Sequence, residues 1–167
     1  MKKTIIGILL VLLFGTVVPY KYDNEKAVRY AIKNVNNRSK CMCAWYVMRA
    51  IQSGGCYPLG IYPAYAYSEI LLKYGFVEID NPQKGDIVVL SNNSKHPYGH
   101  IAVYDVNKWY SDYKQKSVYP NNTYRNESSV RYFRQSNGWH TANIWVNPID
   151  LIKYVNVFVE NYNKIKL

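Results

Sequence analysis

The spacing of apolar residues changes near the middle of the chain, and this change restricts the folds that the sequence can adopt. Before residue 75 the apolar positions recur at helical spacing, as at Val47, Ala50 and Ile51. After residue 85, short apolar runs such as 87–90 are separated by polar turns, which is typical of strands. Helices that precede strands predict an α+β domain with an antiparallel sheet, in contrast to alternating βαβ units.

Capping and turn residues set the bounds of the expected elements. A helix capped by Asp23 or Asn24 precedes a second helix, which begins at Cys43 and stops at the glycine pair 54–55, and a third from Pro63 to about residue 74. Strands are expected at 86–90, 100–104, 108–112 and 130–134, and a closing helix at about 148–163. We therefore expect N-terminal helices packed on a central antiparallel β-sheet, with an extra C-terminal helix.

Residues 1–20 have the features of a leader. Lys2 and Lys3 precede an apolar run from Ile5 to Val18, which is typical of a secretory signal and shorter than the about 20 residues of a membrane span. Residues 15–19 lack the small-x-small cleavage pattern, so a cleaved signal peptide and a retained short anchor both stay open. We expect a secreted, periplasmic or cell-envelope protein, with transient membrane contact through the leader only and a single domain at 21–167.

The chain is strongly basic, with 21 lysines and arginines against 11 acids and a net charge of +10. The basic residues are scattered and match no zinc-finger or ribonucleoprotein signature, so we expect no nucleic-acid partner. An anionic polymer of the cell envelope accounts for the charge equally well.

Cys43 is the candidate nucleophile. It opens a predicted helix, where free N–H groups and the positive end of the helix dipole lower the pKa of a thiol. The N–H groups at this helix start, those of Ala44 and Trp45 among them, can also hold the oxyanion that forms when a thiolate attacks an amide. Cys41 is a second candidate nucleophile, and Cys43 by itself is also compatible with a buried apolar role.

His100 and Asp112 are the candidate base and its orienting acid. His100 follows Gly99, which lets a substrate or another backbone segment approach closely. If residues 105–108 form a turn, antiparallel pairing brings Asp112 within reach of an imidazole–carboxylate hydrogen bond. With Cys43, the two residues make up the nucleophile, base and orienting group of cysteine hydrolases.

Metal and cofactor chemistry are not expected. The chain has no paired CxxC and no HExxH pattern, and His96 and His140 lie in polar, loop-like surroundings without a spaced acid partner. A disulfide between Cys41 and Cys56 is not expected either, because the intervening helix of about 12 residues would hold them about 18 Å apart.

Three segments resemble the CHAP amidases and their NlpC-type relatives, which are papain-like cysteine hydrolases of bacterial peptidoglycan. The segments are CAWYV at 43–47 with the following RAI and GG, PQKGDIV at 82–88, and GHIAVY at 99–104. The stretch WYSDYKQ at 109–115 is similar to a subgroup that includes amidase effectors of type VI secretion, in which an acid at the position of Asp112 completes the triad. The Cys-x-Trp-Tyr-Val register favours Cys43 over Cys41 as the nucleophile.

This resemblance, over about residues 40–134, implies a papain-like NlpC/CHAP fold and a cysteine amidohydrolase of peptidoglycan. It implies that Cys43 attacks the carbonyl, that His100 takes and returns the proton, and that Asp112 holds the imidazole. Both the bond to the muramoyl lactyl group and the bonds within the stem peptide stay open as targets. Wall remodelling and interbacterial attack, the latter with a cognate immunity protein, stay open as roles. Other readings are a non-catalytic cell-wall-binding module and a cysteine amidase or acyltransferase with a non-wall substrate.

Overall fold

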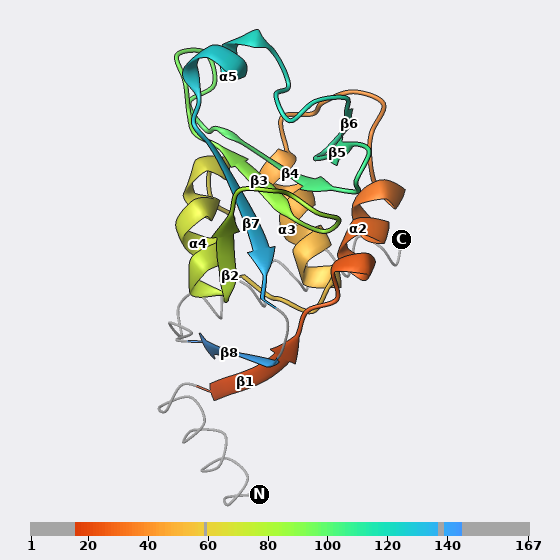
Figure 1. Ribbon diagram of the computed structural model, residues 1–167, viewed down its shortest axis with the longest axis vertical. Helices are drawn as coiled ribbons and strands as arrows, with labels where there is room; N and C mark the ends of the chain where they lie inside the picture. Colours follow the sequence, from red (N-terminus) through yellow and green to blue (C-terminus); the bar gives the residue numbers. More distant parts are fainter. Residues whose placement is uncertain (1–15, 59, 137–138, 145–167) are drawn as a thin grey trace, which may run out of the picture. The chain divides into compact units, whose positions relative to one another are not determined.

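The computed structural model describes residues 16–58, 60–136 and 139–144 (Figure 1). The chain divides into two units, of which Tyr20–His140 holds every candidate site residue. Of the other unit the structure describes residues 16–19 and 141–144. Strands β1 (Thr16–Lys21) and β8 (Trp139–Ile144) pair in a two-stranded sheet. The expected closing helix at 148–163 and most of the expected leader lie outside the described residues, so the domain bounds stay a prediction.

The three predicted helices are present close to their expected bounds. They are α2 (Asn24–Lys33), α3 (Cys43–Ser53) and α4 (Tyr67–Lys73), the last preceded by a 3₁₀ turn at Ala64–Ala66. The Asp23 side chain caps α2 by accepting the Lys26 N–H at 2.8 Å, which satisfies one of the free donors of the first turn. No helix of the described residues is long and apolar enough to cross a membrane.

Six strands form one antiparallel sheet in the order β2-β7-β3-β4-β5-β6, which confirms the α+β prediction. Their bounds are β2 Phe76–Ile79, β3 Ile87–Leu90, β4 His100–Tyr104, β5 Trp109–Tyr110, β6 Lys114–Gln115 and β7 Val130–Gln135. The sequence did not predict β2, β6 or helix α5 (Asn122–Glu127), because each is too short to show a clear periodicity.

Both faces of the central strands are buried, and this divides the residues of β4 between two apolar clusters. Ile101 and Val103 pack with the buried face of α3, which lies against β4 in Figure 1. Ala102 packs on the opposite side with Trp109 and with Tyr124 of α5. Because successive side chains of a strand point to opposite faces, His100 shares its face with Ala102.

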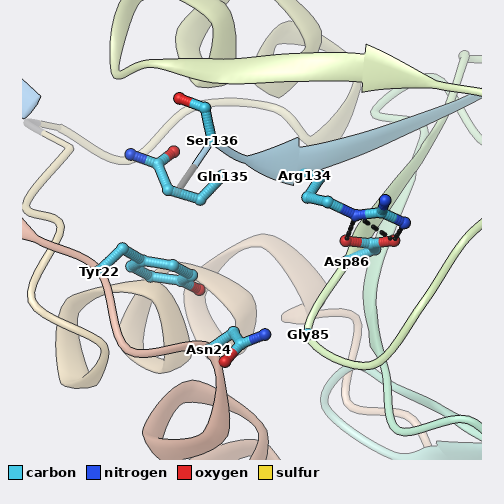
Figure 2. Close-up of a pocket in the computed structure, with 7 residues that line it drawn as sticks. All are labelled: Tyr22, Asn24, Gly85, Asp86, Arg134, Gln135 and Ser136. Carbon is cyan, nitrogen blue, oxygen red and sulfur yellow. Dashed lines mark hydrogen bonds and ion pairs between the residues drawn. The ribbon is translucent and has the colours of Figure 1, made fainter. Parts of the chain in front are cut away.

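An ion pair between a buried acid and a partly exposed arginine ties β7 to the start of β3. Asp86 is 2% exposed and accepts three hydrogen bonds from the Arg134 guanidinium, two from Nε at 2.9 and 3.2 Å and one from Nη2 at 2.6 Å. Figure 2 shows Arg134 reaching Asp86 beside a small pocket, with Tyr22 and Asn24 on another wall. None of the candidate site residues lines this pocket, so the pair serves the fold by holding the turn into the central sheet.

Candidate active site

Cys43 is the first residue of α3, as the sequence predicts, and its sulfur lies beside β4. The N–H groups of Ile101, Ala44 and Cys43 itself hydrogen-bond to the sulfur and favour its thiolate form. Strand β5 pairs with β4 only at Val103 and Tyr104, so it does not run alongside Ile101. The start of α3 therefore meets β4 at a point beyond the end of β5.

Burial decides the charge of the thiol. It is the largest of the effects that together raise the pKa of Cys43 to about 11; the backbone hydrogen bonds from Ile101 and Ala44 lower this pKa, and the nearby negative charge of Asp112 also raises it. The expectation that the helix start gives a low thiol pKa is therefore wrong for the free protein. The cost of desolvating a thiolate exceeds what the first N–H groups of the helix supply.

His100 is the first residue of β4 and is 6% exposed. Burial lowers the pKa of its imidazole to about 4, although the charge of Asp112 and the hydrogen bond with Gln115 both raise it. Cys43 and His100 are consequently both uncharged at neutral pH. The imidazole then has the free lone pair that a general base needs.

Asp112 is fully buried, and its carboxylate binds the loop that leads into α3. Its Oδ2 atom accepts hydrogen bonds from the Lys40 N–H at 2.5 Å, the Met42 N–H at 3.2 Å and the Ser39 hydroxyl at 3.1 Å. Its Oδ1 atom accepts from the Ser111 hydroxyl at 3.1 Å. The expected hydrogen bond between Asp112 and His100 is not among the hydrogen bonds of the described residues, so Asp112 acts on the imidazole through its charge.

Strand register explains why this hydrogen bond does not form. The predicted turn at 105–108 is present, with the Asp105 N–H donating to the Lys108 carbonyl, and Val103 pairs with Tyr110. Two pairs further on, this register would put Asp112 opposite Ile101. Neighbouring residues on a strand point to opposite faces, so Asp112 belongs to the face that His100 does not occupy.

Gln115, which the sequence analysis did not single out, is the hydrogen-bond partner of His100. Its Nε2 lies 2.7 Å from His100 Nε2 and 2.8 Å from the Ser111 hydroxyl oxygen. Gln115 pairs with Trp109, and Trp109 pairs with Tyr104, so these three side chains lie on one face of the sheet. Because side chains alternate along β4, His100 lies on the same face as Tyr104 and therefore as Gln115. The position of Gln115 on the face of His100 would have predicted this contact. The strand that sets this position has only two residues, and so short a strand has no apolar pattern by which the sequence could predict it.

Ala44 and Trp45, predicted to hold the oxyanion or substrate, flank the nucleophile. The Ala44 N–H reaches the Cys43 sulfur. The Trp45 ring packs partly on the core, edge to face with Tyr46 at 5.0 Å, and the Arg49 guanidinium lies 5.8 Å from its centroid. Their roles toward an oxyanion stay predictions.

Gly99 permits another backbone segment to approach closely. Its φ is +68°, and a Cβ atom at this position would lie 2.5 Å from the Leu90 carbonyl oxygen and 3.1 Å from Tyr65. The Gly99 carbonyl also accepts the Tyr124 hydroxyl at 2.8 Å. This glycine therefore fixes where His100 enters the sheet, and its predicted contact with substrate stays a prediction.

The remaining cysteines and the loop histidine lie outside this arrangement. Cys41 is exposed and has a left-handed backbone with φ 58°, Cys56 is buried, and all three cysteines are free thiols. His96 stacks on the Tyr124 ring at 4.6 Å. In the described part of the chain, no three or more His, Cys, Asp or Glu side chains are grouped so that they could hold a metal ion.

Comparisons with known proteins identify the family and the fold. Residues 33–113 match the family model of the CHAP domain. The chain is similar to the effector in the crystal structure of the type VI native effector–immunity complex Tae3–Tai3 from Ralstonia pickettii. The two share 37% identity with a TM-score of 0.66, over 69% of this chain and 100% of the other.

A second structure, of the selenomethionine form of the same complex, gives 38% identity and a TM-score of 0.61 over 64% and 97% of the two chains. The comparison with curated proteins gives no match. The CHAP match contains Cys43, His100 and Asp112 and ends two residues before Gln115. This chain belongs to the CHAP domain family.

Proposed function

We propose that the protein is a cysteine amidohydrolase that cleaves amide bonds of bacterial peptidoglycan. The observation that carries this proposal is the position of the Cys43 sulfur, beside the Ile101 N–H and at the start of α3. The residue before Ile101 on β4 is His100, a buried and uncharged imidazole. A thiol at a helix start, a neutral base at the start of the strand beside it and backbone N–H donors at the sulfur are the groups that acyl transfer requires.

The arrangement supports a two-step reaction. His100 takes the proton from the Cys43 thiol while the sulfur attacks the scissile carbonyl carbon, and N–H groups near the sulfur stabilise the oxyanion. The tetrahedral adduct collapses to a thioester as the imidazolium gives its proton to the leaving amine. Water then attacks the thioester with His100 as base, which releases the carboxylic acid and restores the thiol.

Membership of the CHAP family and the similarity to the effector of a type VI effector–immunity complex support a peptidoglycan substrate. The net charge of +10 suits an anionic envelope polymer. The target bond is either that between the muramoyl lactyl group and L-alanine or one within the stem peptide. These two amides leave different products, so one digestion distinguishes them.

Digestion of purified sacculi followed by mass spectrometry of the soluble fragments tests the proposal. Wild-type protein should release fragments that carry one new amine and one new carboxylate for each bond cut, and Cys43→Ala should release none. Free stem peptides would identify a muramoyl-alanine amidase, whereas shortened stems would identify an endopeptidase. Wild-type protein that sediments with sacculi and releases nothing would identify a wall-binding module and refute catalysis.

The same similarity supports an antibacterial role with a cognate immunity protein, and the predicted leader supports export. Expression directed to the periplasm of a Gram-negative host should lyse the cells, and Cys43→Ala should not. Growth unaffected by active enzyme in the periplasm would favour wall remodelling in the producing cell.

A further inference from the structure

Two separate hydrogen-bond systems surround the nucleophile and the base. The Asp112 carboxylate binds the backbone of Lys40 and Met42, directly before the nucleophile. The Gln115 carboxamide lies against His100 Nε2. The Ser111 hydroxyl contacts both side chains, Asp112 Oδ1 at 3.1 Å and Gln115 Nε2 at 2.8 Å, and so joins the two systems.

We propose that Gln115 is the residue that positions the His100 imidazole, and that Asp112 positions the loop carrying Cys43. The proposal rests on the proposed function for its catalytic consequence and on the hydrogen bonds for its geometry. It assigns to a neutral amide the task that the family resemblance gave to the carboxylate of Asp112.

The contact with Gln115 determines which imidazole nitrogen can act as base. His100 Nε2 is occupied by the amide at 2.7 Å, so Nδ1 is the nitrogen left to take the proton from Cys43. A base that uses Nδ1 must carry its resting proton on Nε2 and donate it to an acceptor. The oxygen of the Gln115 carboxamide is such an acceptor.

The carboxamide of Gln115 gives this residue a property that a carboxylate lacks. In the observed orientation the amide nitrogen faces His100 and Ser111, and Oε1 is buried without a hydrogen-bond partner in the described part of the chain. A half-turn of the carboxamide brings Oε1 to the same place, where it accepts from the Nε2–H of His100. The amide can thus bind either tautomer of the imidazole, which a carboxylate cannot do.

Asp112 has a different set of partners, and all of them except Ser111 lie before Cys43 in the chain. Three groups donate to its Oδ2 atom, the N–H groups of Lys40 and Met42 and the hydroxyl of Ser39. Its own carbonyl accepts from the Asn36 N–H at 2.9 Å and from the Asn36 side-chain amide at 2.8 Å. These contacts hold the segment 36–42, whose Cys41 has a strained left-handed backbone, so that α3 starts at Cys43.

Three variants of the full chain test this division: Gln115→Leu, Gln115→Glu and the matched control Asp112→Asn. Each is assayed for kcat and KM on a peptidoglycan fragment, for the ¹⁵N shift of His100 Nε2, and for hydrogen exchange at the amides of Lys40 and Met42. Gln115→Leu should lower kcat by about 100-fold with little change in KM, because the base is misoriented and no substrate contact is lost. Gln115→Glu should recover at least about tenfold of this loss and move the acid limb of the pH profile upward, because a carboxylate stabilises the imidazolium.

Asp112→Asn should speed exchange at Lys40 and Met42 and leave the hydrogen-bonded shift of His100 Nε2 in place. Gln115→Leu should change that shift and leave the exchange unaltered. A Gln115→Leu enzyme with wild-type kcat and an unchanged Nε2 shift would overturn the proposal, as would an Asp112→Asn protein that loses the Nε2 hydrogen bond. If wild-type protein hydrolyses nothing, the proposed function fails, and the shift and the exchange rates still decide which residue holds His100.

Discussion

Acidification should destabilise the protein through His100 before its carboxylates titrate. Burial lowers the pKa of this imidazole from 6.5 to about 4, so between these values the unfolded chain binds a proton that the folded chain does not. Stability therefore is fully present above pH 6.5 and is lost as the pH falls toward 4. For these two pKa values, the free energy of unfolding contributed by His100 falls by about 2 kcal/mol between pH 8 and pH 5.

Urea unfolding followed by circular dichroism at pH 8 and at pH 5 measures this loss, with His100→Gln as the matched control. The variant has no imidazole at position 100, so its free energy of unfolding should change less between the two pH values. The remaining acids and histidines are common to both proteins, and the difference between the two changes isolates His100. If both proteins lose the same free energy within about 0.5 kcal/mol, the imidazole is not buried uncharged as described.

The remaining predictions concern the nucleophile, one glycine and the ion pair between Asp86 and Arg134. Cys43→Ala should abolish hydrolysis and Cys41→Ala should keep most of it; the reverse result would move the nucleophile to Cys41. The rate of Cys43 alkylation by iodoacetamide should climb through the alkaline range, because burial raises its pKa to about 11, and a plateau near pH 5 would contradict this. Gly99→Ala should cost at least about 2 kcal/mol of stability, since its Cβ would lie 2.5 Å from a backbone oxygen at φ +68°, and an unchanged urea midpoint would argue against that clash. Asp86→Ala should cost about 2 kcal/mol by leaving the partly buried Arg134 unpaired, and a loss below about 0.5 kcal/mol would show that the pair is dispensable.

Helices and long strands were predictable because their signals are local. The cap at Asp23, the apolar spacing from Cys43 to Ile51 and the glycines after it are read within one or two turns of chain. The same holds for β3 and β4, where continuous apolar runs indicate strands buried on both faces. The shortest elements, β5 and β6, have two residues each, so no window of sequence can define their ends.

The order of nucleophile and base along the chain was also readable from sequence. Cys43 lies at a helix start and His100 at a strand start, and both positions are present in the structure. A residue at the end of an element is placed by that element alone, so no distant contact is needed to predict it. The CHAP resemblance, confirmed by the family match at 33–113, came from the same local segments.

The partners and charges of these residues depended on contacts between distant segments. Whether Asp112 or Gln115 meets His100 depends on the face to which each residue points, and that face is set by strand register and by the bend after Tyr110. The pKa of the Cys43 thiol depends on how much water the packing of α3 against β4 removes, which outweighs the local effect of the helix start. The sequence by itself determined which residue types stand at the ends of α3 and β4, because capping and periodicity act within a few residues. Only the tertiary structure decided their hydrogen-bond partners and protonation. Both depend on how segments that are far apart in the sequence pack against one another and exclude water.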